Sequence, residues 1–186
     1  MKKILLVCLI SASFIACTNQ VETKEPVAEN PVVKDEPVAA EEKKIVYPFE
    51  ASFTSDWKIG NAENAVVILN LYKNLVADAP VDSSIRFFAD TLTSISFDDK
   101  VFTGSSKDFL KRVRLFREQF KTLNEEVISF VPLYSPSKNV EQVSLWVKEK
   151  GVRLNGKVDS TVYQENWRFN SEGKINFRSA YARYSF

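Results

Sequence analysis

The sequence predicts an α+β domain over residues 45–186, with helices covering one face of an antiparallel sheet. Two observations lead to this prediction. Up to about residue 122 the apolar positions recur at helical spacing, and beyond it they alternate as in strands. The Asn155-Gly156 pair is the strongest short hairpin signal in the chain. The predicted region has an ordinary size for one domain.

The first helix of this domain follows an asparagine that would cap its N-terminus. Asn61 and Asn64 both fit the capping position, and the helix is predicted to end near Pro80. Apolar residues at helical spacing form its inner stripe: Ala62, Ala65, Val66, Leu69, Tyr72 and Val76.

Two more helices are predicted before residue 122. A short one starts at Asp82, and a longer one is capped by Ser105 or Ser106. Both have apolar inner faces, made of Ile85, Phe87, Phe88, Phe109, Leu110, Val113, Phe116 and Phe120.

Alternating apolar and polar residues predict strands in the rest of the domain. The predicted strands cover residues 91–97, 126–133, 140–154, 157–169 and 174–184. Asn155-Gly156 joins two of them, and the segment from Asn170 to Gly173 is a second tight turn. The long strands therefore follow one another as a meander.

Composition excludes several classes of function. Lys and Arg number 25 against 24 Asp and Glu, so the charge balance gives no reason to expect nucleic acid as a partner. The chain has no histidine, which excludes His-ligated metals and His-dependent nucleophilic catalysis. We expect no metal site and no cofactor.

The N-terminus is predicted to be a secretory signal over residues 1–16. The positive start Met1-Lys2-Lys3 precedes an apolar run of about 13 residues, which is too short to span a bilayer as a helix. The end of this run, Phe14-Ile15-Ala16-Cys17, resembles a bacterial lipoprotein lipobox. The resemblance implies cleavage before Cys17, acylation of this cysteine and anchoring in a membrane. Thr18 after the cysteine favours the outer membrane of the cell envelope. The alternative is a plain cleaved signal with an incidental cysteine.

Residues 17–44 are predicted to be the lipidated cysteine and a disordered tether. The segment repeats Glu, Pro, Val, Ala and Lys without aromatic residues, so it has too little apolar area to offset the entropy of ordering. The remaining cysteine, Cys8, lies within the signal. The mature domain is therefore expected to have no thiol for a disulfide, a nucleophile or a metal site.

Two motifs and their spacing resemble the nuclear-transport-factor-2-like (NTF2-like) superfamily, which includes SnoaL-like proteins and ketosteroid isomerases. The first motif is Phe87-Phe88-Ala89-Asp90, which leads into a short strand. The second is the late stretch from Trp167 to Ile175, followed by Ala180-Tyr181. The resemblance implies a strongly curved, mostly antiparallel sheet wrapped around helices, which forms a cone with an apolar pocket. It also implies dimerisation through the outer face of the sheet as an alternative use of the fold.

The resemblance to ketosteroid isomerases carries over only part of a catalytic site. The tyrosine that donates a hydrogen bond to an enolate oxygen would be Tyr72, and the acidic donor would be Glu165. The position of the catalytic base is Ser96, and the nearest carboxylates are Asp98 and Asp99. A serine without a partner base has no useful basicity near neutral pH. Tyr72 as a plain core residue and Glu165 as a solvent-facing residue are the competing interpretations.

Aromatic residues are the main candidates for the wall of the pocket, although most aromatics serve only as core. We expect the pocket to be lined by Tyr72, Phe87, Phe88, Trp146, Tyr163, Glu165 and Trp167, with Tyr181 and Tyr184 as further aromatic candidates.

Two functional hypotheses follow. In the first, a lipid-anchored envelope protein binds a small apolar ligand in this pocket, or uses its sheet face for assembly as a homodimer, without catalysis. In the second, Tyr72 and Glu165 polarise the carbonyl of a substrate while Asp98 or Asp99 takes a proton, as in a cofactor-free isomerase or dehydratase. The second hypothesis requires Tyr72, Glu165 and one of the two aspartates to converge on one cavity, and the first does not.

Overall fold

The computed structural model describes residues 46–76 and 80–184. The elements follow one another as β1 (Lys58–Ile59), α1 (Ala62–Val76), the 3₁₀ helix η1 (Val81–Phe87), β2 (Phe88–Ile95), β3 (Val101–Ser105), α2 (Ser106–Arg117), β4 (Phe120–Ser135), β5 (Val140–Arg153), β6 (Val158–Phe169) and β7 (Ile175–Tyr184). The predicted signal, Cys17 and the tether lie outside the described residues.

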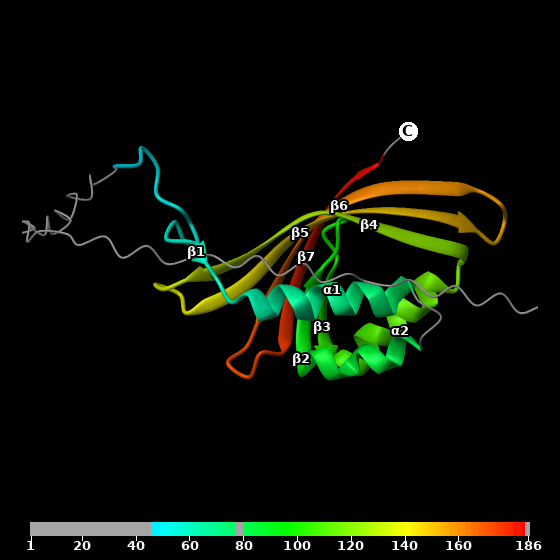
Figure 1. Ribbon diagram of the computed structural model, residues 1–186, viewed down its shortest axis with the longest axis horizontal. Helices are drawn as coiled ribbons and strands as arrows, with labels where there is room; N and C mark the ends of the chain where they lie inside the picture. Colours follow the sequence, from blue (N-terminus) through cyan, green and yellow to red (C-terminus); the bar gives the residue numbers. More distant parts are fainter. Residues whose placement is uncertain (1–45, 77–79, 185–186) are drawn as a thin grey trace, which may run out of the picture. The chain divides into compact units, whose positions relative to one another are not determined.

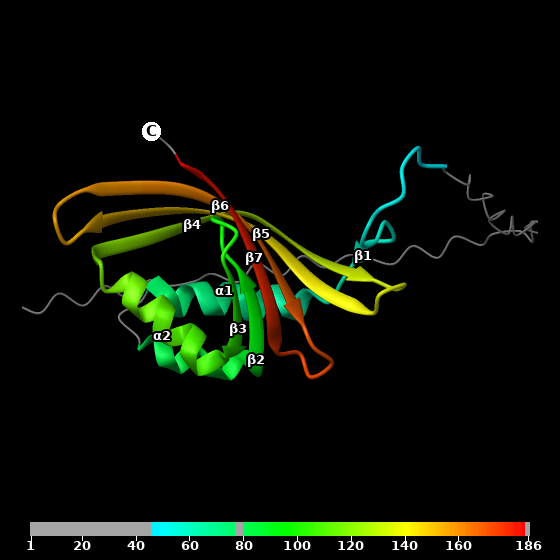
Figure 2. The ribbon, with the colours of Figure 1, turned by 180° about the vertical axis from the view of Figure 1, so that it is seen from behind.

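The strands form one mixed sheet of seven strands, in the order β1-β4-β5-β6-β7-β2-β3. The pair β2–β7 is parallel, and the other neighbours are antiparallel. The long strands curve over the helices, which lie on one side of the sheet (Figure 1). The view from behind shows the same arrangement (Figure 2). The predicted α+β class with an antiparallel-rich, curved sheet is confirmed.

The helices start where the sequence places a capping side chain. The Asn61 side chain accepts a hydrogen bond from the Glu63 amide at 2.9 Å, so Asn61, and not Asn64, caps α1. Ser105 caps α2, since its hydroxyl accepts from the Asp108 amide at 3.1 Å. In each case the first of the two predicted capping residues takes the role.

The predicted turns join the long strands. Gly156 has a φ of 84° and Gly173 a φ of 70°, values that an L side chain rarely adopts. The Arg153 amide bonds to the Lys157 carbonyl at 2.8 Å across the first turn. Both turn predictions are confirmed.

Several predicted boundaries were wrong. β2 starts at Phe88 rather than at residue 91, and β4 begins at Phe120 rather than at residue 126. Strands β1 and β3 were not predicted, and the short helix from Asp82 is a 3₁₀ helix. The starts of β2 and β4 depend on pairing with strands that are distant in the sequence, such as Phe88 with Ile175 and Phe120 with Arg153. Local alternation therefore did not predict them.

The core lies between the helices and the inner face of the sheet. Its fully buried side chains come from both layers: Ile68, Leu71, Leu110, Val143, Leu145, Val147 and Ile175. On β5 the inner face is made of alternate residues, from Val143 to Val147, as the period of a strand requires. The buried face of α1 packs on this sheet face through Ala65, Ile68, Leu71 and Tyr72. The predicted inner stripe was partly wrong, since Ala62 and Val66 are exposed.

Candidate functional site

A cavity of about 430 Å³ lies between the inner face of the sheet and the helices. Its size falls within the usual range for small-molecule sites, about 300–1,000 Å³. Most of its wall is apolar or aromatic, from Leu71, Leu75, Phe88, Phe97, Val101, Phe102, Phe109, Leu110, Val113, Phe116, Leu123, Val147, Tyr163 and Trp167. A few polar and charged side chains also reach it.

One end of the cavity is organised around the carboxylate of Glu165, which is 3% exposed. The Tyr72 hydroxyl, from α1, donates a hydrogen bond to Glu165 Oε2. Trp167 Nε1 donates to the same oxygen at 2.9 Å. The guanidinium of Arg178, from β7, forms an ion pair with Glu165 Oε1. Both oxygens of the carboxylate are therefore occupied by donors of the chain itself.

The electrostatics of this cluster keep Tyr72 protonated. Burial raises the pKa of the Tyr72 hydroxyl well above its ordinary value, and the negative charge of Glu165 raises it further. The ring of Tyr72 meets the ring of Trp167 edge-on, with centroids 6.4 Å apart. The Arg178 guanidinium lies 5.4 Å from the centroid of the same Trp167 ring. The four side chains thus form one mutually satisfied unit, in which Tyr72, Glu165 and Trp167 are buried and Arg178 is partly exposed.

The position that resembles the catalytic base lies at the turn between β2 and β3. Ser96 donates a hydrogen bond to Asp98 Oδ1 at 2.6 Å, and Asp98 forms an ion pair with Lys100. The hydrogen bond from Lys100, and then the one from Ser96, lowers the pKa of Asp98 to about 2. A carboxylate with so low a pKa is a weak base near neutral pH.

The two candidate aspartates take different positions. Asp98 lines the cavity together with Ser96 and Lys100, whereas Asp99 is not among the lining residues. Asp99 has a φ of 59° and forms the corner of the β2–β3 turn. Tyr72, Glu165 and Asp98 therefore face one cavity, and Asp99 does not.

The predicted aromatic wall needs two corrections. Phe88, Tyr163 and Trp167 line the cavity, but Phe87 and Trp146 do not. Leu145 and Val147 on either side of Trp146 point inward, so strand alternation turns Trp146 to the opposite face. Phe87 packs against the edge of the core beneath the Arg86 guanidinium, 4.8 Å from its ring centroid.

The two further aromatic candidates stand apart from the cavity. Tyr181 is 60% exposed, and it alternates with the inward-facing Ala180 on β7. The side chain of Tyr184 lies outside the described part of the chain.

Two glutamates on the cavity wall were missed by the sequence analysis. Glu125 and Glu149 are register partners on β4 and β5, and both line the cavity. Burial, then Glu149, raises the pKa of Glu125 to about 9; burial, then Glu165, raises that of Glu149 to about 7. Glu149 lies two residues after Val147 on the predicted strand, so strand alternation could have placed it on the same inner face. Glu125 fell just before the predicted strand.

The part of the chain that the structure describes lacks a metal-binding cluster and a membrane-spanning helix. It holds no group of three or more His, Cys, Asp or Glu side chains arranged for a metal ion. Among the same residues, no helix has the length and hydropathy needed to cross a membrane.

Comparison with known proteins finds relatives in structure only. No protein-family model and no curated sequence matches the chain. An NTF2-like protein of unknown function from Exiguobacterium sp. 255-15 superposes with a TM-score of 0.51 at 16% identity, over 64% of this chain and 98% of that one.

Two other solved structures are similar to the same extent. The epoxide hydrolase/cyclase-like enzyme SalBIII, from pyran ring formation in salinomycin, gives a TM-score of 0.50 at 11% identity, over 65% of this chain and 91% of that one. A protein from Catenulispora acidiphila with a ketosteroid isomerase-like fold was solved in complex with trimethylamine. It gives a TM-score of 0.50 at 9% identity, over 62% of this chain and 83% of that one. The chain therefore has the α+β fold of NTF2-like proteins.

Proposed function

We propose that the domain binds a small molecule with a largely apolar body in the cavity beneath the sheet, without transforming it. One observation carries this proposal: the polar side chains of the cluster form hydrogen bonds with one another, while the apolar cavity beside them has room for a ligand. Tyr72, Trp167 and Arg178 all direct their donors to Glu165. The cavity keeps about 430 Å³ of space that the aromatic residues around it do not fill.

The catalytic alternative has less support from the same contacts. An isomerase or dehydratase would need Tyr72 and Glu165 to donate hydrogen bonds to an oxygen of the substrate. Tyr72 donates to Glu165 instead, and the Arg178 guanidinium forms an ion pair with Glu165, so neither side chain is directed at a substrate oxygen. Asp98, with a pKa of about 2, is a weak base for the proton transfer.

We further propose that the chain is attached to the outer membrane through acyl groups on Cys17 and that residues 18–44 act as a tether. The lipobox-like residues Phe14 to Cys17 and the composition of the tether support this proposal. A Cys17→Ser variant is expected to move from the membrane fraction to the soluble fraction and to lose incorporation of labelled palmitate. Equal fractionation of the two forms would contradict the proposal.

A cavity-filling substitution tests the binding proposal. Val113 lines the cavity from α2, so Val113→Trp should fill part of the space and lower the affinity for 4-phenylbutan-1-ol. Val66 on α1 is 55% exposed and does not line the cavity, so Val66→Trp is the matched control. Isothermal titration calorimetry should give weaker binding for the first variant alone. Absence of binding to the wild-type chain would overturn the proposal.

A further inference from the structure

Glu125 and Glu149 form a pair of acidic side chains on the cavity wall. They lie directly opposite each other on adjacent strands, where Cβ atoms are about 4.5–5.5 Å apart. Like charges in this arrangement repel each other, so such a pair is destabilising unless a proton or a cation lies between the carboxyl groups.

Among the residues that the structure describes, neither glutamate has an ion-pair partner. Glu125 Oε2 is buried, and it has no hydrogen-bond partner among these residues. A buried carboxylate oxygen without a donor is costly, because it has lost water and gained nothing in exchange.

The cations near this pair have other contacts. Arg178 forms an ion pair with Glu165, and Arg153 forms one with Asp159. Arg117 from α2 faces Glu125 and lowers its pKa, but it also donates to the Val76 carbonyl at 2.9 Å. Two more cations line the cavity: Lys100 pairs with Asp98, and Arg112 lies over the Phe102 ring. Each cation on the cavity wall thus has a contact other than Glu125 and Glu149, and Arg153 is not among the lining residues.

Aromatic rings line the same cavity as the pair. Phe97 and Phe102 come from the β2–β3 hairpin, Phe116 comes from α2 and Tyr163 comes from β6. The faces of aromatic rings attract cations. The Arg112 guanidinium already lies over the Phe102 ring, 4.6 Å from its centroid. The cavity therefore combines carboxyl groups with the rings that often surround organic cations.

We propose that the ligand is an organic cation, an ammonium group on an apolar body, and that its charged nitrogen binds between Glu125 and Glu149. This inference rests on the proposed function and names the chemical class of its ligand. The apolar body would contact the aromatic wall, while the ammonium would supply the donors that Glu125 Oε2 lacks. The Tyr72–Glu165–Arg178 cluster remains as it is.

Binding would exchange a proton for the cation. Both glutamates keep their protons to a higher pH than an ordinary carboxyl group, since the pKa of Glu125 is about 9 and that of Glu149 is about 7. The ligand 4-phenylbutyltrimethylammonium has no N–H donor but carries the same charge at every pH, so it should bind more tightly at pH 9 than at pH 6 through its charge alone. The neutral alcohol should show no such rise, because it does not displace the proton.

The test compares three ligands that share one body and differ in the head group: 4-phenylbutylamine, 4-phenylbutan-1-ol and 4-phenylbutyrate. Isothermal titration calorimetry on the full-length chain at pH 7.5 should give affinities that decrease from the amine to the alcohol and then to the carboxylate. We expect the amine to bind at least about tenfold more tightly than the alcohol, which is the scale of one good charge contact.

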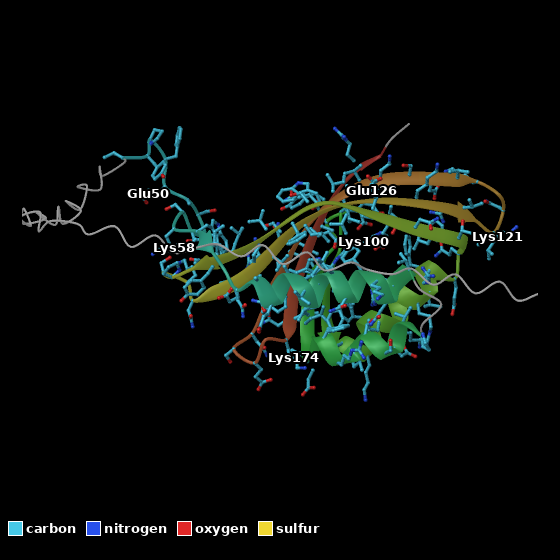
Figure 3. All side chains as sticks on the ribbon, viewed as in Figure 1. Glu50, Lys58, Lys100, Lys121, Glu126 and Lys174 are labelled. Carbon is cyan, nitrogen blue, oxygen red and sulfur yellow. The ribbon has the colours of Figure 1, made fainter. Side chains whose placement is uncertain are left out.

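Variants locate the effect. Glu125→Gln/Glu149→Gln should remove the preference for the amine over the alcohol, since Gln resembles the protonated acid in shape but cannot carry its negative charge. Glu126→Gln is the matched control: this exposed residue lies on the face of the sheet away from the helices (Figure 3). It should keep the preference of the wild-type chain.

Each outcome has a separate meaning. Equal or tighter binding of the alcohol by the wild-type chain overturns the cation proposal and leaves the apolar binding site in place. Failure of all three ligands to bind overturns both. A preference for the amine that survives in the double variant also overturns the assignment to Glu125 and Glu149.

Discussion

The carboxylate of Glu165 determines the chemistry at one end of the cavity. It accepts from Tyr72 and Trp167 and forms an ion pair with Arg178, although these side chains come from three different elements. The resemblance to the NTF2-like superfamily predicted that Tyr72 and Glu165 belong to one site. Arg178 was not predicted, because only the pairing of β6 with β7 brings it beside Trp167.

Removing the largely buried cation of Arg178 should cost stability. Arg178→Met leaves a buried carboxylate without its partner, and breaking such a pair typically costs about 3–5 kcal/mol. Urea denaturation should show this loss, and Glu165→Gln/Arg178→Met should be less destabilised than the sum of the single variants. Arg114→Met, which breaks the exposed pair with Asp82, should cost no more than about 1 kcal/mol. Equal losses for the two arginines would contradict this account of the cluster.

The glutamate pair predicts a direction for the pH dependence of stability. Folding raises the pKa of Glu125 to about 9 and that of Glu149 to about 7, from an ordinary value of 4.5. Between these limits the unfolded chain binds fewer protons than the folded chain. The free energy of unfolding contributed by these groups is therefore fully present below pH 4.5 and is lost as the pH rises through 7 and 9.

Two variants check this dependence by urea denaturation at a series of pH values. Glu125→Gln cannot lose a proton, so its free energy of unfolding should fall less steeply than that of the wild-type chain above pH 5. The exposed Glu126→Gln should follow the wild-type curve. Identical slopes for all three chains would refute the assigned protonation.

At the scale of elements, the predicted helices and long strands were found, and their ends were often displaced. Capping residues and turn glycines act locally, which explains why α2 and the Gly156 turn were predicted. β3 was missed because its five residues are ordered by pairing with β2, where Gly104 lies opposite Leu92. Glu125 was missed for the same reason, since the register of β4 against β5 extends that strand beyond its alternating part.

Close approach across β4 and β5 depends on Gly151. A Cβ at this position would lie 2.5 Å from Phe120 Cδ1 and 2.9 Å from Leu123 Cδ1. The Phe120 ring has little freedom to move, because it packs against Phe116 and beneath the Arg153 guanidinium. Gly151→Ala should therefore lower the free energy of unfolding by about 1–3 kcal/mol, as overpacking does.

A second substitution distinguishes the clash from other causes. Phe120→Leu removes the ring, so Gly151→Ala/Phe120→Leu should lose less stability than the two single variants together. Strict additivity in thermal or urea denaturation would show that the ring is not what the glycine accommodates.

At the scale of the whole molecule, the curved sheet uses its two faces differently. The inner face encloses the core and the cavity, while the outer face carries a polar network in which Ser144 donates to Asn166 at 2.7 Å and Arg168 donates to Gln142 at 3.1 Å. Phe53 covers Arg168, with the guanidinium 4.4 Å from its ring centroid. The alternation of apolar and polar residues predicted that the sheet has two different faces. It did not predict that the segment before β1 covers part of the outer face, because that contact forms only in the folded chain.

Dimerisation through the outer face stays a prediction. Tyr181, which is 60% exposed on this face, would lie in the interface. A Tyr181→Glu variant should then shift the chain from dimer to monomer in analytical ultracentrifugation, whereas the exposed Val66→Glu on α1 should not. A wild-type chain that sediments as a monomer at all concentrations would exclude this use of the sheet.

Native mass spectrometry of the chain purified from its own cells shows whether the cavity beneath the sheet holds a small molecule. We expect one bound molecule per chain. Organic extraction should recover it as a compound with an apolar body and an amine, and the Val113→Trp variant should lose it. A chain that carries no bound molecule, and that retains neither 4-phenylbutylamine nor 4-phenylbutan-1-ol when they are added, would contradict the binding proposal.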